Sequence, residues 1–418
     1  MTSTLYAPGV FFRPASTAPA IYKAASGERR TQLSHDVDSR LRAATTTRAL
    51  LVILEEQLQH FDAANLVVAF TCAAKLDDCQ EMSGFEAHAV WQSLLERLRA
   101  VVHELEPRGM SMTAYGAARL LCGDAKLLVA LGQVGVQRAP DFGPTDVAKA
   151  CWAFAKLAFV PAWQDEASHF RVDRSVSESK ASVSISFWQA MAREAPRAVR
   201  NSSRFVDTSM IAWAFATAGQ GDAALFEELS KATLADCSTL PPRSLAGMSW
   251  AFAKGKYTDS SLLHAVATQA TRIASEFTAH DTTTLCWSFS RLAHREEHMY
   301  FALASNLAPQ QELLRLSPGL AAELAWAYAA ANVFHAQLFE KLECLFLWNC
   351  HDLETEDVAG FAWALASGLH HEGEQRLDLK QFDAVHSALR GYHDRFAPRL
   401  RAAELRIVLW ALEIFEAR

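Results

Sequence analysis

The chain has 418 residues, half of them apolar, with only 18 glycines and 13 prolines and a formal net charge of −7. Its eight cysteines include no C-x-x-C pair, and no uncharged apolar run reaches the roughly 18 residues of a membrane-spanning helix. This composition argues against a disulfide-rich secreted domain, a membrane-spanning protein and a largely disordered chain. It favours a packed, mostly helical protein in a reducing compartment.

Residues 1–48 are predicted to form a leader that precedes the folded array. This stretch is rich in Ser, Thr, Ala and Pro, has no acidic residue before Glu28, and carries Arg13 and Lys23. Such a composition is typical of an organelle transit peptide, and we expect delivery to the mitochondrial matrix in preference to the chloroplast stroma. A disordered leader without a targeting role is the alternative.

A short helical phrase built around one aromatic residue recurs through the rest of the chain, with a period near 37 residues. Clear copies are CWAFAKL, which begins at Cys151, and SWAFAKG, which begins at Ser249. The anchors are Trp152, Trp213, Trp250, Trp287, Trp326, Trp363 and Trp410, separated by 61, 37, 37, 39, 37 and 47 residues. Tyr115 takes the anchor place one period before Trp152, and Thr71 takes it in a weaker copy that begins at Asn65.

Each phrase is rich in alanine, lacks strand alternation and extends over about twelve residues, so it predicts one helix, here called helix A. Ser317 before Pro318 is an expected N-cap, and so are four aspartates that lie six residues before an anchor. These aspartates are Asp146, Asp207, Asp281 and Asp357. An amphipathic helix B is predicted after each helix A, over residues 223–234, 259–273, 296–307, 337–348 and 379–392.

Paired helices at this period predict an all-α fold: an α-solenoid of helix-pair repeats with a period near 37–39 residues. The array is expected to span residues 49–418, with about nine repeats and a C-terminal half-repeat over 397–418. Two long anchor intervals predict inserts between helices A and B, near 164–186 and 370–379. Each insert is either a partner-binding loop or a tolerated solvated insertion.

The two sides of helix A carry different residues. The positions two and five residues away from the anchor on either side are apolar, as Phe154 and Phe252 illustrate, and should face helix B. The anchor lies on the opposite side among small residues. We expect it to wedge into a neighbouring repeat. The alternative is that some indoles line a surface and stack on nucleobases.

The position four residues after the anchor is basic in most of the early repeats and in none of the last three. Its occupants, in chain order, are Lys75, Arg119, Lys156, Thr217, Lys254, Arg291, Ala330, Ser367 and Ile414. Equivalent positions align in a stacked array, so a basic ridge is predicted, and its five cations would neutralise RNA phosphates. The alternative is that each is a solvated cation favoured by the helix dipole.

Motifs for catalysis or metal binding are not found. The sequence has no G-x-G-x-x-G, Walker loop, G-x-S-x-G or H-E-x-x-H. His294 and His298 have metal-ligand spacing, but they fall in an expected solvated turn. We therefore expect no enzyme activity, no catalytic residue, no metal, no cofactor, no small-molecule substrate and no membrane partner.

The repeat phrase, (D/S)-x5-W-A-F-A-K-L followed by a second helix, resembles the octotricopeptide repeats of algal organelle RNA-binding proteins. It is also similar to the helical repeats of apicomplexan and FAST-kinase-like mitochondrial proteins and of a subunit of the RNA-editing substrate-binding complex. The likeness covers about residues 65–418, and no RAP-type domain is expected after Trp410. The resemblance implies selective binding of single-stranded RNA, in support of the processing, stability or translation of organelle transcripts.

A second hypothesis starts from the acidic stretch 340–380, which has nine acidic and three basic residues. In this interpretation the chain is a protein-interaction scaffold or a mitoribosome-associated subunit. Its acidic C-terminal third would dock a basic partner. Both hypotheses allow protein partners or a ribonucleoprotein complex.

Overall fold

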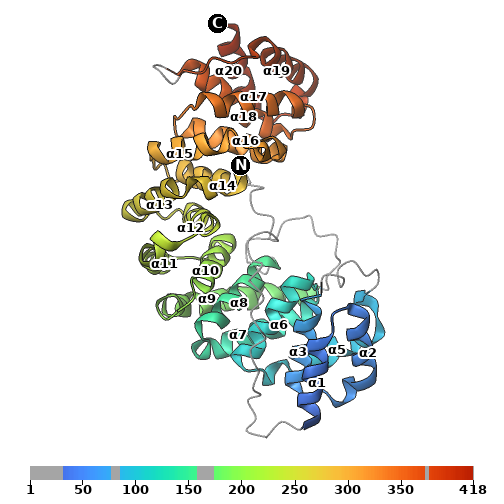
Figure 1. Ribbon diagram of the computed structural model, residues 1–418. Coiled ribbons are helices and arrows are strands. Elements are labelled where there is room, and N and C mark those ends of the chain that lie inside the picture. Colours follow the sequence, from blue (N-terminus) through green and yellow to red (C-terminus); the bar gives the residue numbers. More distant parts are fainter. Residues whose placement is uncertain (1–31, 77–84, 158–173, 372–375, 418) are drawn as a thin grey trace. The chain divides into compact units, whose positions relative to one another are not determined.

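A computed structural model describes residues 32–76, 85–157, 174–371 and 376–417 (Figure 1). These residues form α-helices joined by turns and short 3-10 helices, and none of them lies in a β-strand. They divide into two compact units, with the boundary between Ala232 and Thr233.

In the first unit, the A helices pack on one another in chain order, each against the next. They are α1 (Gln32–Ala43), α3 (Ala63–Ala73), α6 (Pro107–Leu120), α8 (Pro144–Lys156) and α10 (Phe205–Ala218). The B helices form a second layer in which α2 contacts α5, α5 contacts α7 and α7 contacts α9. They are α2 (Thr47–Gln57), α5 (Ala89–Val101), α7 (Ala125–Arg138), α9 (Arg174–Arg200) and α11 (Ala223–Asp236), and the unit boundary falls within α11.

The second unit repeats this arrangement (Figure 1). Its A helices are α12 (Pro242–Gly255), α14 (Ala279–Arg291), α16 (Pro318–Ala330), α18 (Thr355–His370) and α20 (Ala402–Glu416). Its B helices are α13 (Ser260–Arg272), α15 (Glu297–Leu307), α17 (Ala336–Asn349) and α19 (Phe382–Phe396). Because successive A helices contact each other within each unit, and B helices form a second layer beside them, the predicted all-α solenoid of helix pairs is confirmed.

A short 3-10 helix and one buried apolar residue connect many B helices to the next helix A. These 3-10 helices are η1 (Leu58–His60), η3 (Val102–Glu104), η4 (Ala139–Asp141), η5 (Cys237–Thr239), η6 (Ala274–Glu276) and η8 (Ala397–Arg399). Two others are η2 (Phe85–Ala87) and η7 (Gln311–Arg315). The residue after each of the first six is extended, with its side chain in the core: Phe61, Leu105, Phe142, Leu240, Phe277 and Leu400. At these six connections, the chain therefore changes direction where an apolar side chain is buried.

Arginines of the B helices bind the backbone of the preceding connection. Arg97 donates to Leu58 O and, at 2.7 Å, to Phe61 O. The equivalent bonds join Arg138 to Leu105 O, Arg197 to Phe142 O and Arg272 to Ser238 O, at 3.2, 3.1 and 2.8 Å. Each guanidinium binds backbone carbonyl groups of the connection, outside the hydrogen-bond ladders of the α-helices. These arginines therefore fix neighbouring repeats to each other, a role that the sequence analysis did not predict.

The prediction that four aspartates act as N-caps is wrong. Asp146, Asp207, Asp281 and Asp357 are each the third residue of their helix, and the N-caps are Gly143, Arg204, Thr278 and Glu354. An acidic side chain is favourable anywhere in the first turn, so its offset from the anchor does not distinguish these positions. Asp146 accepts a hydrogen bond from Ser111 Oγ (2.8 Å), and Asp207 accepts one from Thr145 Oγ1 (2.6 Å). These aspartates link one helix A to the next. Ser317 is at the expected N-cap position of α16, but its side chain makes no capping hydrogen bond.

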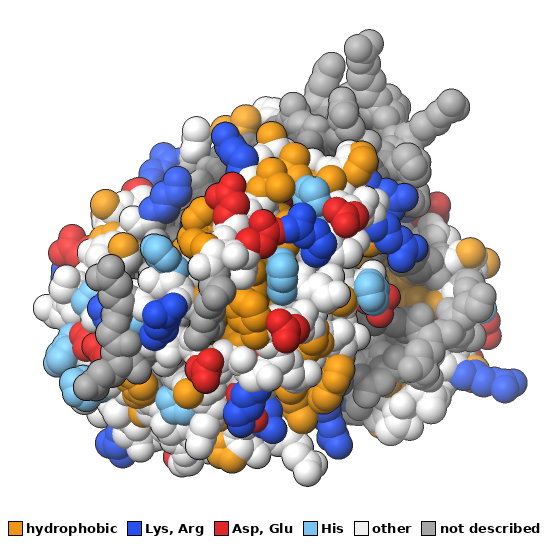
Figure 2. Space-filling model, turned by 90° about the horizontal axis from the view of Figure 1, so that it is seen from above, with side chains coloured by type: hydrophobic (Ala, Val, Ile, Leu, Met, Phe, Trp, Pro, Cys, Tyr) orange, Lys and Arg blue, Asp and Glu red, His pale blue; other side chains and the backbone are white. Residues whose placement is uncertain are grey.

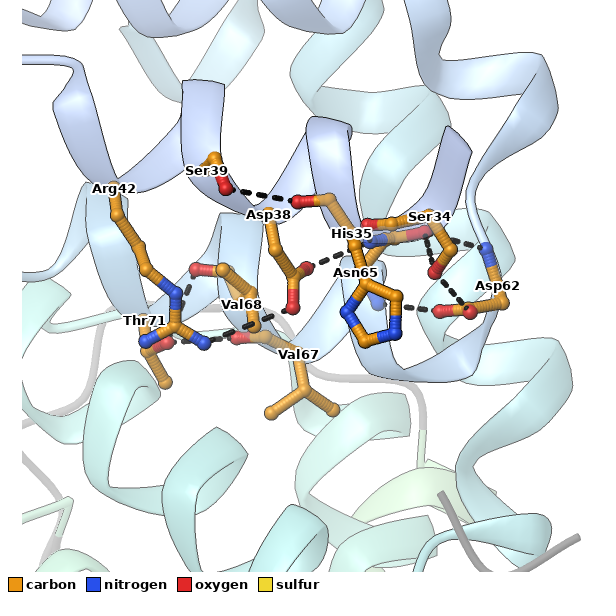
Figure 3. A network of polar contacts seen from close by, with 10 residues as sticks. All are labelled: Ser34, His35, Asp38, Ser39, Arg42, Asp62, Asn65, Val67, Val68 and Thr71. Carbon is orange, nitrogen blue, oxygen red and sulfur yellow. Dashed lines mark hydrogen bonds and ion pairs between the residues drawn. The ribbon is translucent and has the colours of Figure 1, made fainter. Parts of the chain in front are cut away.

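The predicted leader boundary at residue 48 is also wrong, because α1 and α2 form a helix pair of the array. A buried polar network joins α1 to α3 (Figure 3). The Asn65 side chain donates to Asp38 Oδ1 (2.7 Å) and to Ser34 O (2.9 Å), and it accepts from Ser34 Oγ (3.1 Å). Asn65 and Asp62 also form a reciprocal capping box at the start of α3. Residues 1–31, which hold the rest of the predicted leader, lie outside the described residues.

Replacing Asn65 by alanine is expected to lower the free energy of unfolding by about 2–3 kcal/mol, because buried partners on α1 lose their hydrogen bonds. Urea denaturation followed by circular dichroism measures this change. The control is Ser39→Ala on the exposed side of α1, which should change stability by less than about 0.5 kcal/mol. Equal effects of the two substitutions would show that the network does not hold α1 in place.

The inserts predicted near 164–186 and 370–379 are only partly described. Residues 174–186 belong to the long helix α9, so this part of the first insert is an extension of helix B and not a loop. In the second insert, His370 ends α18, and Leu377 and Leu379 are buried. The remaining residues of the first insert, 164–173, and residues 372–375 of the second lie outside the described ranges.

Candidate nucleic-acid interface

The anchor tryptophans lie between successive A helices. In the first unit, the ring of Trp152 lies 5.0 Å from that of Tyr115 and 6.2 Å from that of Trp213. Only 3% of Trp152 and 6% of Trp213 is exposed, and in the second unit Trp250 and Trp287 are each 4% exposed. This burial agrees with a wedge between repeats and leaves no open ring face for a base. The later anchors Trp326, Trp363 and Trp410 are half-buried.

The aromatic residue two positions after the anchor points toward helix B, as expected from its side of the helix. The Phe154 ring is 4.1 Å from Phe187 on α9, and the Tyr328 ring is 5.2 Å from Tyr300 on α15. Helix A is therefore held on two sides. The residues of the predicted ridge lie one turn after the anchor, on nearly the same side of the helix as the anchor.

Three ridge cations lie over the anchor ring one turn before them. Lys156 Nζ is 5.1 Å from the Trp152 ring centre, Lys254 Nζ is 5.8 Å from that of Trp250, and the Arg291 guanidinium is 5.8 Å from that of Trp287. The spacing of four residues places each pair on one helix face. A cation over an indole is stabilised by about 0.5–1 kcal/mol at an exposed site. The anchors thus hold these charges in fixed, repeated positions.

Successive ridge cations lie near enough to repel each other. Partial burial of the Lys254 ammonium lowers its pKa, and the charge of Arg291 on the next helix A lowers it further, against an opposing effect of Glu323. In the first unit, burial and the charge of Arg119 lower the pKa of Lys156 in the same way. A bound anion would relieve this repulsion.

The ridge cations differ from the arginines of the B helices in what they bind. Among the residues that the structure describes, Lys75, Lys156, Lys254 and Arg291 have no carboxylate within ion-pair distance. Lys75, Lys254 and Arg291 are exposed, whereas Arg119 and Lys156 are half-buried. Arg119 lies beside Tyr115, where its charge opposes the rise in the pKa of the Tyr115 hydroxyl that burial causes. Lys75, Lys156, Lys254 and Arg291 are thus placed where a charged ligand could reach them, whereas Arg119 also interacts with Tyr115.

The sequence analysis missed a further cation beside the ridge, Lys149. Its Nζ is 6.0 Å from the centre of the Tyr115 ring. Burial lowers the pKa of Lys149, and the charge of Arg108 adds to this, while Asp146 and Asp207 act in the opposite direction. The sequence contained a signal for Lys149, because a residue three positions before Trp152 lies on nearly the same side of the helix as Trp152.

The charge pattern is local. In the view of Figure 2, Lys and Arg side chains are interspersed with Asp and Glu, and no broad field of one sign covers that face.

The predicted turn with His294 contains a polar cluster in which Glu296 Oε1 is 3.3 Å from His294 Nε2 and 3.0 Å from His264 Nδ1. Within the described ranges, no group of His, Cys, Asp and Glu is arranged to hold a metal ion. Likewise, no described helix has the length and hydropathy to cross a bilayer.

Comparison with known proteins does not assign the chain to a family. No family model matches the chain, and no curated protein matches it. Among solved structures it is similar to a chain of a homology model of the full-length AP-3 complex in an intermediate open conformation. That match has 11% identity and a TM-score of 0.31, and it covers 92% of this chain and 75% of the other. A likeness at this level supports no statement on function.

Proposed function

We propose that the chain is a non-enzymatic helical-repeat protein that binds single-stranded RNA along its A helices. The observation that supports this most directly is that Lys156, Lys254 and Arg291, at one repeat position, lie over anchor rings and have no carboxylate partner among the described residues. Phosphates are the ligands that such a row would neutralise. Because packed helices lie roughly 8–10 Å apart, one repeat matches about one nucleotide of an extended strand.

The organelle setting is part of the proposal and rests on the composition of residues 1–31 and on the likeness of the repeat phrase to octotricopeptide repeats. In this setting, the protein supports the processing, stability or translation of organelle transcripts, in the mitochondrial matrix. Residues Lys75, Arg119, Lys156, Lys254 and Arg291 contact phosphates, and Lys149 adds a further charge in the first unit.

The double substitution Lys254→Glu with Arg291→Glu is expected to weaken binding of a single-stranded RNA by roughly ten- to a hundredfold at about 50 mM salt. Two phosphate contacts become repulsive, while the buried anchors remain in place. Fluorescence anisotropy with a labelled RNA of mixed sequence measures the change.

A matched control is Arg315→Glu with Lys341→Glu, which makes the same change in net charge outside the A helices of the second unit. Its RNA affinity should stay within about threefold of the original. If both double variants lose affinity equally, the effect comes from net charge alone, and the ridge is not the binding surface.

A further inference from the structure

The second unit contains a cavity of about 470 Å³ where the first turns of α18 and the start of α20 meet α14 and α16. Two indoles, four carboxylates and one arginine contribute to its lining. These residues are Trp287, Trp326, Glu323, Glu354, Glu356, Asp357 and Arg401. The volume is within the range of sites that hold a small ligand or a single side chain.

The positive charge in the cavity is already bound. Arg401 Nη2 donates to Glu356 Oε2 at 3.0 Å, and the same guanidinium pairs with Glu404. Glu323 Oε2 is buried and has no hydrogen-bond partner among the described atoms. A buried carboxylate oxygen without a partner is costly and uncommon in folded proteins, so this atom points to a ligand.

The carboxylates of the cavity also disfavour each other's ionisation. Burial raises the pKa of Glu323 to about 8, and the charges of Asp357 and Glu356 add to this, while Lys254 opposes it. Burial, Glu356 and Glu354 raise the pKa of Asp357 to about 6. A cation in the cavity would favour the ionised carboxylates and remove this repulsion.

The aromatic lining suits a planar cation. The Trp287 ring already has the guanidinium of Arg291 over it, 5.8 Å from its centre. Trp326 is half-buried and lines the same cavity. A guanidinium stacks on indoles and donates two parallel hydrogen bonds to a carboxylate, which an ammonium does not do in the same fixed geometry.

We propose that this cavity binds an arginine side chain from a basic segment of a partner protein. Glu323 and Asp357 accept its hydrogen bonds, and Trp326 covers the guanidinium plane. A nucleotide fits less well, because its phosphates would approach the carboxylates. The cavity adjoins the ridge, since the charge of Lys254 acts on Glu323 and Arg291 lies over Trp287, but the proposal does not require that the protein bind RNA.

The test uses two fluorescent peptides that differ at one residue: a short peptide with a central arginine, and the same peptide with citrulline, which has the same shape without the charge. With the full chain, the arginine peptide is expected to bind at least about tenfold more tightly. Affinity should increase from about pH 6 to about pH 9 as Glu323 loses its proton, with Asp357 and Glu356 opposing that loss and Lys254 aiding it. Equal binding of the two peptides, or tighter binding of guanosine monophosphate, would overturn the proposal.

Two variants test whether the arginine peptide binds in the cavity. Glu323→Gln should reduce the preference for arginine over citrulline to less than about threefold. Asp383→Asn, which removes a carboxylate at an exposed position of α19, should leave it unchanged. Trp326→Leu gives a second test if Glu323→Gln alters the fold, and it should lower arginine affinity by about threefold or more. The proposal is wrong if the preference survives both Glu323→Gln and Trp326→Leu. These assays contain no RNA, so their result is separate from that for the ridge.

Discussion

Replacing Trp152 by alanine is expected to lower the free energy of unfolding of the first unit by about 3–5 kcal/mol. The ring is 3% exposed and lies between Tyr115 and Trp213, so its removal leaves a cavity between three successive A helices. Such a cavity is costly in a repeat array, because each repeat is stabilised by its neighbours. Urea denaturation followed by circular dichroism measures the change.

The control is Trp348→Ala on α17, where the same side chain is 64% exposed. Its removal should change stability by less than about 0.5–1 kcal/mol. If Trp152→Ala is no more destabilising than Trp348→Ala, the anchors do not join the repeats, and their periodicity would need another explanation.

The stability of the second unit is expected to fall as the pH rises from about 5 to about 8.5, by about 2–4 kcal/mol. The pKa of Glu323 is raised to about 8 in the folded protein, and that of Asp357 to about 6. Above the ordinary pKa of a carboxyl group, the unfolded chain releases these protons while the folded protein retains them. Each pH unit in this window therefore favours unfolding, until Glu323 ionises in the folded state near pH 8.

Glu323→Gln removes the titrating group at nearly constant volume. We expect this variant to be more stable than the original above about pH 7 and to have a flatter dependence of stability on pH. Thermal denaturation in a series of buffers gives both curves. A dependence on pH that is the same in Glu323→Gln as in the original would show that Glu323 is not the responsible group.

The sequence predicted the fold well because every repeat carries the same physical pattern. The helix-B range 259–273 differs from α13 by one residue at each end, since apolar periodicity is strong in an amphipathic helix. The first helix pair was missed because α1 has no anchor tryptophan, and the polar residues Asn65 and Asp38 hold it in place. Sequence periodicity does not report such bonds between distant segments.

The candidate site was predictable only in part. The i to i+4 offset from the anchor identified Lys156, Lys254 and Arg291, because that spacing fixes a helix face. The cavity was not predictable, since Trp287, Glu323 and Arg401 come from α14, α16 and the N-cap of α20. Their meeting depends on how the repeats stack. The run of acidic residues over 340–380 predicted an acidic segment, but it did not indicate a specific site.

The most direct test of the proposed function is the salt dependence of RNA affinity for the full chain. Fluorescence anisotropy on a single-stranded RNA of mixed sequence, from about 50 to about 300 mM salt, gives the slope of log affinity against log salt. Contacts with five phosphates predict a slope of roughly −3 to −4. Absence of binding at the lowest salt, or an affinity that does not change with salt, would contradict a phosphate-binding ridge.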